Sequence, residues 1–181
     1  MLKRLCSAAA VAAVLLAASP ARAQYGADKV GPWMFNLQVG PGAFLTSAGS
    51  GGVNGSLVLD LGWAPFDADH NAYLLFPFQF GFGGGNGAAI MVPLGFQYDI
   101  KLPVQQIGLY IMPRFTIGYA AFVCNGCVTA NDGFVTIEVG VKAVFNGRWN
   151  VGVFPLSFPV FFGDTGTFGV YRFLFMGGLN F

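Results

Sequence analysis

The sequence predicts an all-β fold, namely an eight-stranded antiparallel up-and-down transmembrane β-barrel with a polar interior that side chains fill. Three observations lead to this prediction. Apolar and polar residues alternate along most of the chain, as they do in half-buried strands. Hydrophobic residues make up 55% of the chain and charged residues only 9%, against roughly 25% charge in soluble domains. The last strand-like run, 169–181, also ends on an aromatic residue, Phe181.

The start of the chain predicts a cleaved secretory signal peptide. Lys3 and Arg4 give a basic start, an apolar stretch follows, and residues 21–23 place alanine at the two positions that signal peptidase reads. Cleavage is expected between Ala23 and Gln24. The alternative, a retained membrane anchor, needs a longer apolar stretch. We therefore expect a signal peptide at 1–23, a short periplasmic segment at 24–31 and a barrel at 32–181.

Two uncharged stretches, 30–59 and 71–98, are long enough for transmembrane helices. Glycine and proline interrupt both of them, and their hydrophobicity repeats every second residue. A bilayer tolerates strands only in a closed sheet, because an unpaired backbone group is costly in hydrocarbon. The predicted strands span residues 32–44, 56–64, 73–82, 88–100, 106–120, 134–145, 148–161 and 169–181.

In the first four strands one face is apolar and is expected to point outward. Its residues are Trp33, Phe35, Leu37 and Val39 in the first, Leu57, Leu59, Leu61 and Trp63 in the second, Leu74, Phe76, Phe78 and Phe80 in the third, and Ile90, Val92, Leu94, Phe96 and Tyr98 in the fourth. Polar residues such as Asn36, Gln79 and Asp99 occupy the opposite face.

The later strands continue the same pattern. The outward residues are Ile107, Leu109, Ile111, Phe115, Ile117 and Tyr119 in the fifth, Val135, Ile137, Val139 and Val141 in the sixth, and Trp149, Val151 and Val153 at the start of the seventh. The second half of the seventh strand has no clear phase, because Pro155 and Pro159 interrupt the ladder. The eighth strand places Arg172 inward.

Besides Asp99, five charged residues fall on the inward face of the predicted strands: Asp60, Arg114, Glu138, Lys142 and Arg172. A lysine or arginine on the lipid face would cost about 2–4 kcal/mol at the midplane. We expect these side chains to form an interior charge network with neighbouring amides and Thr116. The favoured interpretation is structural, and the alternative is a gate or a narrow polar path.

The tryptophans predict an aromatic girdle. With both chain ends in the periplasm, Trp33, Trp63 and Trp149 all fall at the periplasmic rim, where an indole suits the membrane interface. Asn146-Gly147 predicts a tight hairpin turn at the same rim.

No group of residues predicts catalysis. Cys124 and Cys127 lie in an expected outward loop, where an oxidising envelope favours a disulfide over a redox dithiol or a zinc site. The only histidine, His70, belongs to the opposite rim, so it cannot activate a serine or cysteine at the outer leaflet. We expect no enzyme activity, no cofactor and no metal. The absence of a basic stripe also argues against nucleic acid as a partner.

The terminal pattern Gly177, Leu179 and Phe181, together with the signal peptide and the inward charges, resembles the small outer-membrane β-barrel domain family. That family includes the membrane domain of outer-membrane protein A and short-looped eight-stranded relatives. The resemblance implies an integral place in the bacterial outer membrane and recognition of the last strand by the barrel-assembly machinery. Phe175 departs from the family pattern, in which a polar residue is commoner. The family has no shared activity.

Three functions are compatible with the sequence. The first is a structural or interaction role in the cell envelope, with the lipid bilayer as the main partner. The second is a porin-like narrow channel for small solutes. The third is a soluble secreted barrel that binds an apolar ligand, although such a barrel needs an apolar lumen and a polar exterior, the reverse of the charge pattern here.

Overall fold

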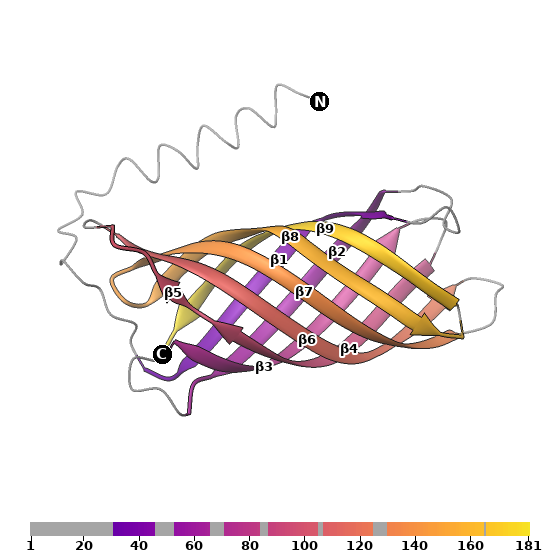
Figure 1. Cartoon of the computed structure of the whole chain (residues 1–181), viewed down its shortest axis with the longest axis horizontal. Coiled ribbons are helices and arrows are strands. Elements are labelled where there is room, and N and C mark those ends of the chain that lie inside the picture. Colours follow the sequence, from indigo (N-terminus) through magenta and orange to yellow (C-terminus); the bar gives the residue numbers. More distant parts are fainter. Residues whose placement is uncertain are drawn as a thin grey trace, which may run out of the picture.

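The computed structural model describes residues 31–45, 53–65, 71–83, 87–104, 107–124, 130–164 and 166–181, which form a closed β-barrel (Figure 1). Its long strands are β1 (Trp33–Phe44), β2 (Val53–Trp63), β3 (Ala72–Gly83), β4 (Gly87–Tyr98), β6 (Gly108–Cys124), β7 (Ala130–Phe145), β8 (Trp149–Gly163) and β9 (Gly166–Asn180). A two-residue strand, β5 (Ile100–Lys101), follows β4 and pairs with the start of β6.

Every long strand pairs antiparallel with the next long strand along the chain, and β1 pairs with β9 to close the sheet. The closing register runs from Met34 opposite Asn180 to Phe44 opposite Val170. No strand of the described barrel wall is therefore left with an unpaired edge, which is how a barrel removes the edge problem of open sheets. The predicted all-β, eight-stranded antiparallel barrel is confirmed.

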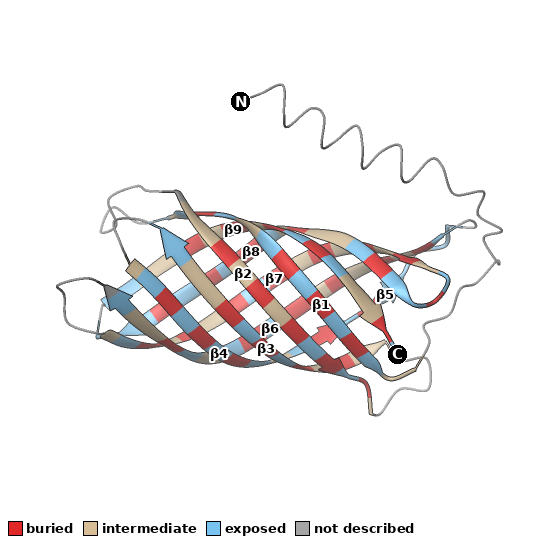
Figure 2. Ribbon diagram, turned by 180° about the vertical axis from the view of Figure 1, so that it is seen from behind, coloured by how far each residue is buried: buried red, intermediate tan, exposed pale blue. Residues whose placement is uncertain are grey.

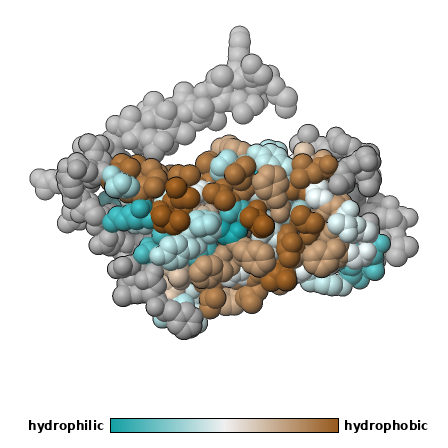
Figure 3. Space-filling view, viewed as in Figure 1, coloured by the Kyte–Doolittle hydropathy of each residue, from teal (hydrophilic) through white to brown (hydrophobic). Residues whose placement is uncertain are grey.

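Burial alternates along the strands, so that each contributes one row of side chains to the lumen and one to the outer wall (Figure 2). The outward row is apolar; Phe35, Phe76 and Ile117 expose 42%, 46% and 51% of their surface. Apolar residues accordingly cover most of the middle of the wall in Figure 3. Among the charged residues that the structure describes, only Lys101, Arg148 and Asp164 are exposed, and they lie in β5 or in turns.

Side chains fill the lumen, and three apolar clusters lie among its polar groups. The cluster at the tryptophan end consists of Met34, Ala64, Tyr73 and Leu75; the second of Val58, Met112, Phe154, Leu174 and Met176; and the one at the opposite end of Ala89, Met91, Ala120, Phe134, Phe161 and Val170. The lumen is thus less uniformly polar than the sequence pattern predicts, because the inward parity also carries many apolar residues.

The turn between β7 and β8 has the expected conformation. Asn146 and Gly147 both have positive φ, at 52° and 67°, and the amide of Arg148 donates to the carbonyl of Phe145 at 3.1 Å. Positive φ at both central residues is the signature of a type I′ turn, whose twist matches the flanking strands.

The phase of β8, which the sequence left unclear, is set by a bulge. Phe154 and Ser157 both point inward, so the alternation changes parity between them. Both neighbouring strands show the register shift here, between Val139 and Val141 on β7 and between Phe154 and Ser157 on the side of β9. Pro155 lies inside the bulge, where its missing N–H removes no ladder hydrogen bond.

Candidate functional site

The interior charge network forms the main polar feature of the lumen. Arg114 on β6 donates from Nη2 to Asp60 on β2 at 2.8 Å and lies 3.4 Å from Glu138 on β7 through Nη1. Arg172 on β9 reaches the other carboxylate oxygen of Glu138 at 3.1 Å. Four charged side chains from four strands therefore form one continuous chain of ion pairs across the barrel.

A second ion pair is linked to the first through an amide. Lys142 on β7 lies 2.6 Å from Asp99, which follows β4. Gln97 donates to Asp99 at 2.8 Å, and its own oxygen accepts from Nε and Nη2 of Arg114 at 3.1 and 2.8 Å. Gln97 thus uses both ends of its amide, and the two groups of charges become one network.

Polar neighbours add hydrogen bonds to the first group of charges, although Oδ1 of Asp60 has no hydrogen-bond partner among the described residues. Ser157 donates to Glu138 at 2.6 Å and accepts from Nε of Arg172 at 3.1 Å. The oxygen of Gln79 accepts from Nη1 of Arg172 at 2.9 Å, and the amide of Gln38 donates to Asp60. Such additional hydrogen bonds are what a buried ion pair needs to offset its desolvation cost.

The network is balanced in charge and closed to solvent. Its three cationic side chains face three carboxylates, and none of the six residues is more than 3% exposed. The guanidinium of Arg114 also lies 4.6 Å from the ring centroid of Phe154, and the ammonium of Lys142 lies 5.6 Å and 5.9 Å from those of Tyr73 and Tyr110. These ring contacts add cation–π stabilisation where water is excluded.

The structure brings together all five charged residues that the sequence placed in this network and adds Asp99 and Ser157. The hydroxyl of Thr116, which was also expected here, has no hydrogen-bond partner among the described residues. Asp99 has the predicted inward orientation, so the alternation of the fourth predicted strand could have identified it as a member of the network. Ser157 could not be found in this way, because its inward orientation depends on the bulge at Pro155. No periodic pattern in the sequence signals that change of phase.

The tryptophans and the chain terminus share one end of the barrel. Trp33 and Trp63 are register partners with stacked rings, 5.7 Å between centroids and 17° between planes. Trp149 pairs with Leu179. The backbones of Trp33 and Phe181 exchange two hydrogen bonds of 2.9 Å, so the terminal residue is fastened to the first strand. Gly177 lies opposite Leu37 on β1.

Some predicted features lie outside the described residues. These are the signal cleavage site at Ala23 and Gln24, the turn that contains His70, and Cys127. Cys124 is the last residue of β6. The disulfide and the signal peptide therefore stay predictions. Among the residues described, no three potential metal-ligating side chains form a group. The same part of the chain holds no helix that is long and apolar enough to cross a membrane.

Comparison with known proteins places the fold but no family. No protein-family model matches the chain, and no curated protein matches it. Among solved structures, the barrel is similar to the crystal structure of neisserial surface protein A, with a TM-score of 0.63 and 8% sequence identity. The match covers 82% of this chain and 97% of that one. At this identity the likeness shows a shared fold, the small closed β-barrel described above.

Proposed function

We propose that the chain is an integral β-barrel protein of the bacterial outer membrane with a non-catalytic, structural or interaction role in the cell envelope. The observation that carries the proposal is the inverted distribution of polarity. Large apolar side chains are exposed on every long strand, while the paired charges are buried in the lumen. A barrel of this kind is stable where its wall meets hydrocarbon and its backbone is fully paired.

Two further features support this placement. Trp33 and Trp149 expose 37% and 59% of their surface at one rim, the depth at which indoles are enriched in membrane proteins. The structural neighbour is named as a surface protein. In the proposed orientation the tryptophan rim faces the periplasm, and the barrel-assembly machinery recognises the last strand, with its Gly177, Leu179 and Phe181, during biogenesis.

A matched pair of lysine variants tests the membrane placement. Leu37 points outward near the middle of β1, and Asn146 is exposed in the β7–β8 turn. In lipid vesicles Leu37→Lys is expected to lower the free energy of unfolding by about 2–4 kcal/mol, whereas Asn146→Lys is expected to change it little. The measurement is urea unfolding followed by the mobility shift between unboiled and boiled samples on a detergent gel.

The same pair of variants separates a membrane barrel from a soluble one. If water covers the wall, a lysine at position 37 replaces an exposed apolar side chain with a solvated charge and leaves stability unchanged. Equal stability of the two variants, together with wild-type protein that dissolves in plain buffer, would overturn the proposal.

A further inference from the structure

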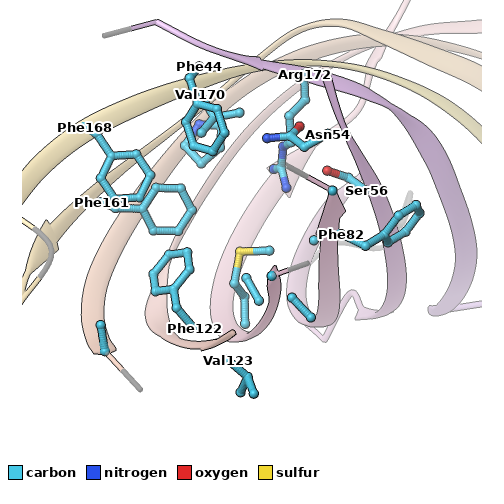
Figure 4. Close-up of a pocket in the computed structure, with 18 residues that line it drawn as sticks. Phe44, Asn54, Ser56, Phe82, Phe122, Val123, Phe161, Phe168, Val170 and Arg172 are labelled. Carbon is cyan, nitrogen blue, oxygen red and sulfur yellow. The ribbon is translucent and has the colours of Figure 1, made fainter. Parts of the chain in front are cut away.

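The lumen holds a cavity of about 370 Å³ at the end opposite the tryptophan rim (Figure 4). Its volume falls within the roughly 300–1,000 Å³ that is typical of small-molecule sites. The charge network borders the cavity through Arg172, but most of the lining is apolar. The cavity therefore differs in chemistry from the rest of the polar lumen.

Aromatic side chains form one side of the cavity. Phe161 and Phe168 stack with their centroids 4.8 Å apart, and Phe122 meets Phe161 edge to face at 5.4 Å. Phe44 lies 5.9 Å from Phe168. In Figure 4 these rings gather on one side, while Asn54, Ser56 and Arg172 lie on the other. The rings pack against one another and form a continuous apolar surface on this side of the cavity.

Small residues create the space opposite the rings. Ser56, Gly81 and Ala89 are register partners in succession, so they form one row across β2, β3 and β4. Ala89 in turn pairs with Phe122 on β6, where the row meets the aromatic side. A Cβ atom built on Gly81 would find its nearest neighbours at 3.5 and 3.7 Å, which is ordinary contact. The cavity is therefore left open because the residues of this row are small, and a side chain at Gly81 would extend into it without a clash at its Cβ atom.

The polar edge of the cavity favours an uncharged group. Arg172 already contacts Glu138, Ser157 and Gln79, so its charge is compensated within the network. Adding an anion would unbalance a buried set of equal positive and negative charges. Asn54 and Ser56 also line the cavity, and the side chain of each carries both a hydrogen-bond donor and an acceptor. A hydroxyl or amide N–H of a ligand can donate to such an acceptor.

We propose that this cavity binds an uncharged amphiphile with one hydrocarbon chain, whose hydroxyl or amide end lies at Asn54 and Ser56 and whose chain packs against the phenylalanine rings. The inference goes beyond the structural or interaction role, because it assigns a small-molecule site to the lumen. It stands on the cavity and its lining, and it does not depend on the identity of any protein partner.

Methionine methyl groups provide a reporter with internal controls. Met91 lines the cavity, whereas Met34, Met112 and Met176 belong to the other two clusters of the lumen. The barrel, labelled with ¹³C at the methionine methyls, is refolded into lipid nanodiscs and titrated with decanol. The expected result is a saturable shift of the Met91 signal, assigned with Met91→Leu, while the other three signals stay in place. Equal shifts of all four signals, or of none, would overturn the proposal.

A pair of alanine variants tests the location. Ala89→Leu adds volume inside the cavity, and Ala43→Leu adds the same volume on the exposed outer face of β1. Ala89→Leu is expected to weaken decanol binding at least tenfold, and Ala43→Leu is expected to leave it unchanged. Both variants are first tested for the heat-dependent gel shift of a folded barrel. Undiminished binding by folded Ala89→Leu would overturn the proposed site, and Gly81→Leu repeats the test should Ala89→Leu not fold.

The ligand class is tested with two relatives of the probe. Decane lacks the polar end, and decanoate replaces the hydroxyl with a charge. Both are expected to bind more weakly than decanol, since decane leaves Asn54 without a donor and decanoate brings an uncompensated charge. Tighter binding of decanoate would mean that Arg172 is available to an anion, and the proposed uncharged ligand class would be wrong.

Discussion

At the scale of single residues, Arg114 is the hub of the interior. Its guanidinium contacts Asp60, Glu138 and Gln97 and lies over the ring of Phe154. Each of these groups comes from a different strand, so one side chain ties β2, β4, β7 and β8 to β6. The buried pairs need not be more stable than an apolar core of equal volume. They do make the loss of any one partner costly, because the remaining charge cannot reach water.

This asymmetry predicts the effect of Arg114→Met. The variant leaves Asp60 and Glu138 buried with less compensation, and the free energy of unfolding is expected to fall by about 3–5 kcal/mol. Arg148→Met removes the same functional group from an exposed turn and is expected to change stability by no more than about 0.5 kcal/mol. Urea unfolding of both variants in lipid vesicles measures the difference. Equal effects would show that the network contributes nothing specific.

Gly40 shows a different constraint, the close approach of β1 to β9. A Cβ atom at this position would lie 1.8 Å from the backbone oxygen of Phe173, which cannot move without disturbing the closing pair of strands. Gly40→Ala is expected to destabilise the barrel by about 1–3 kcal/mol through overpacking. Gly81→Ala is the matched control, because Gly81 lies two strands away in the same row and has room for a methyl group. Unfolding free energies that fall equally for both would contradict this reading.

At the scale of elements, the bulge in β8 reconciles two incompatible phases of the sequence. Before it, Asn150 and Phe154 point inward at even positions; after it, Ser157 and Phe161 point inward at odd positions. The hydroxyl of Tyr171 donates to the carbonyl of Pro155 at 2.7 Å and satisfies an acceptor that the irregular ladder would leave free. The bulge therefore gives Glu138 its serine partner.

Deleting residues tests whether the bulge is a single extra residue. Removing Pro155 restores uniform alternation and leaves Ser157 inward, so this variant is expected to refold with a normal gel shift. Removing Phe158 shortens β8 by one residue as well, but it turns Ser157 outward and Leu156 inward. The refolding yield of this variant is therefore expected to fall several-fold. Refolding of both deletions to the same extent would mean that the phase of β8 is not tied to the network.

The same elements show what the sequence could predict. Seven of the predicted strands have a regular period of two, and the charged residues on their inward parity meet in the structure as expected, as Asp60 and Arg114 do. Two features could not be read in this way. The phase after Pro155 depends on how β8 pairs with both neighbours, and β5 forms only because the chain after Asp99 continues along β6. Both are set by tertiary pairing and not by local pattern.

At the scale of the whole molecule, the lumen changes character along its length. One end is apolar with a cavity, the centre is ionic, and the end with the tryptophans is again closed by an apolar cluster. Met112, Phe154 and Leu174 have no exposed surface, and neither has Asp60. Side chains from several strands are therefore packed together at this level of the described barrel and are closed to solvent. An eight-stranded barrel has an interior just wide enough for side chains to fill.

The closed centre predicts that the wild-type barrel gives no discrete conductance in planar bilayers. A double variant, Arg114→Ala with Phe154→Ala, provides the positive control, because it removes the guanidinium and the ring that lie over each other in the lumen. The space it leaves is bordered by Asp60 and Glu138, so any current is expected to be carried by cations. Folding of the variant is verified by its gel shift before recording. Discrete openings of the wild-type protein would instead require the ion pairs to exchange partners, and the narrow-channel function would then replace the structural one.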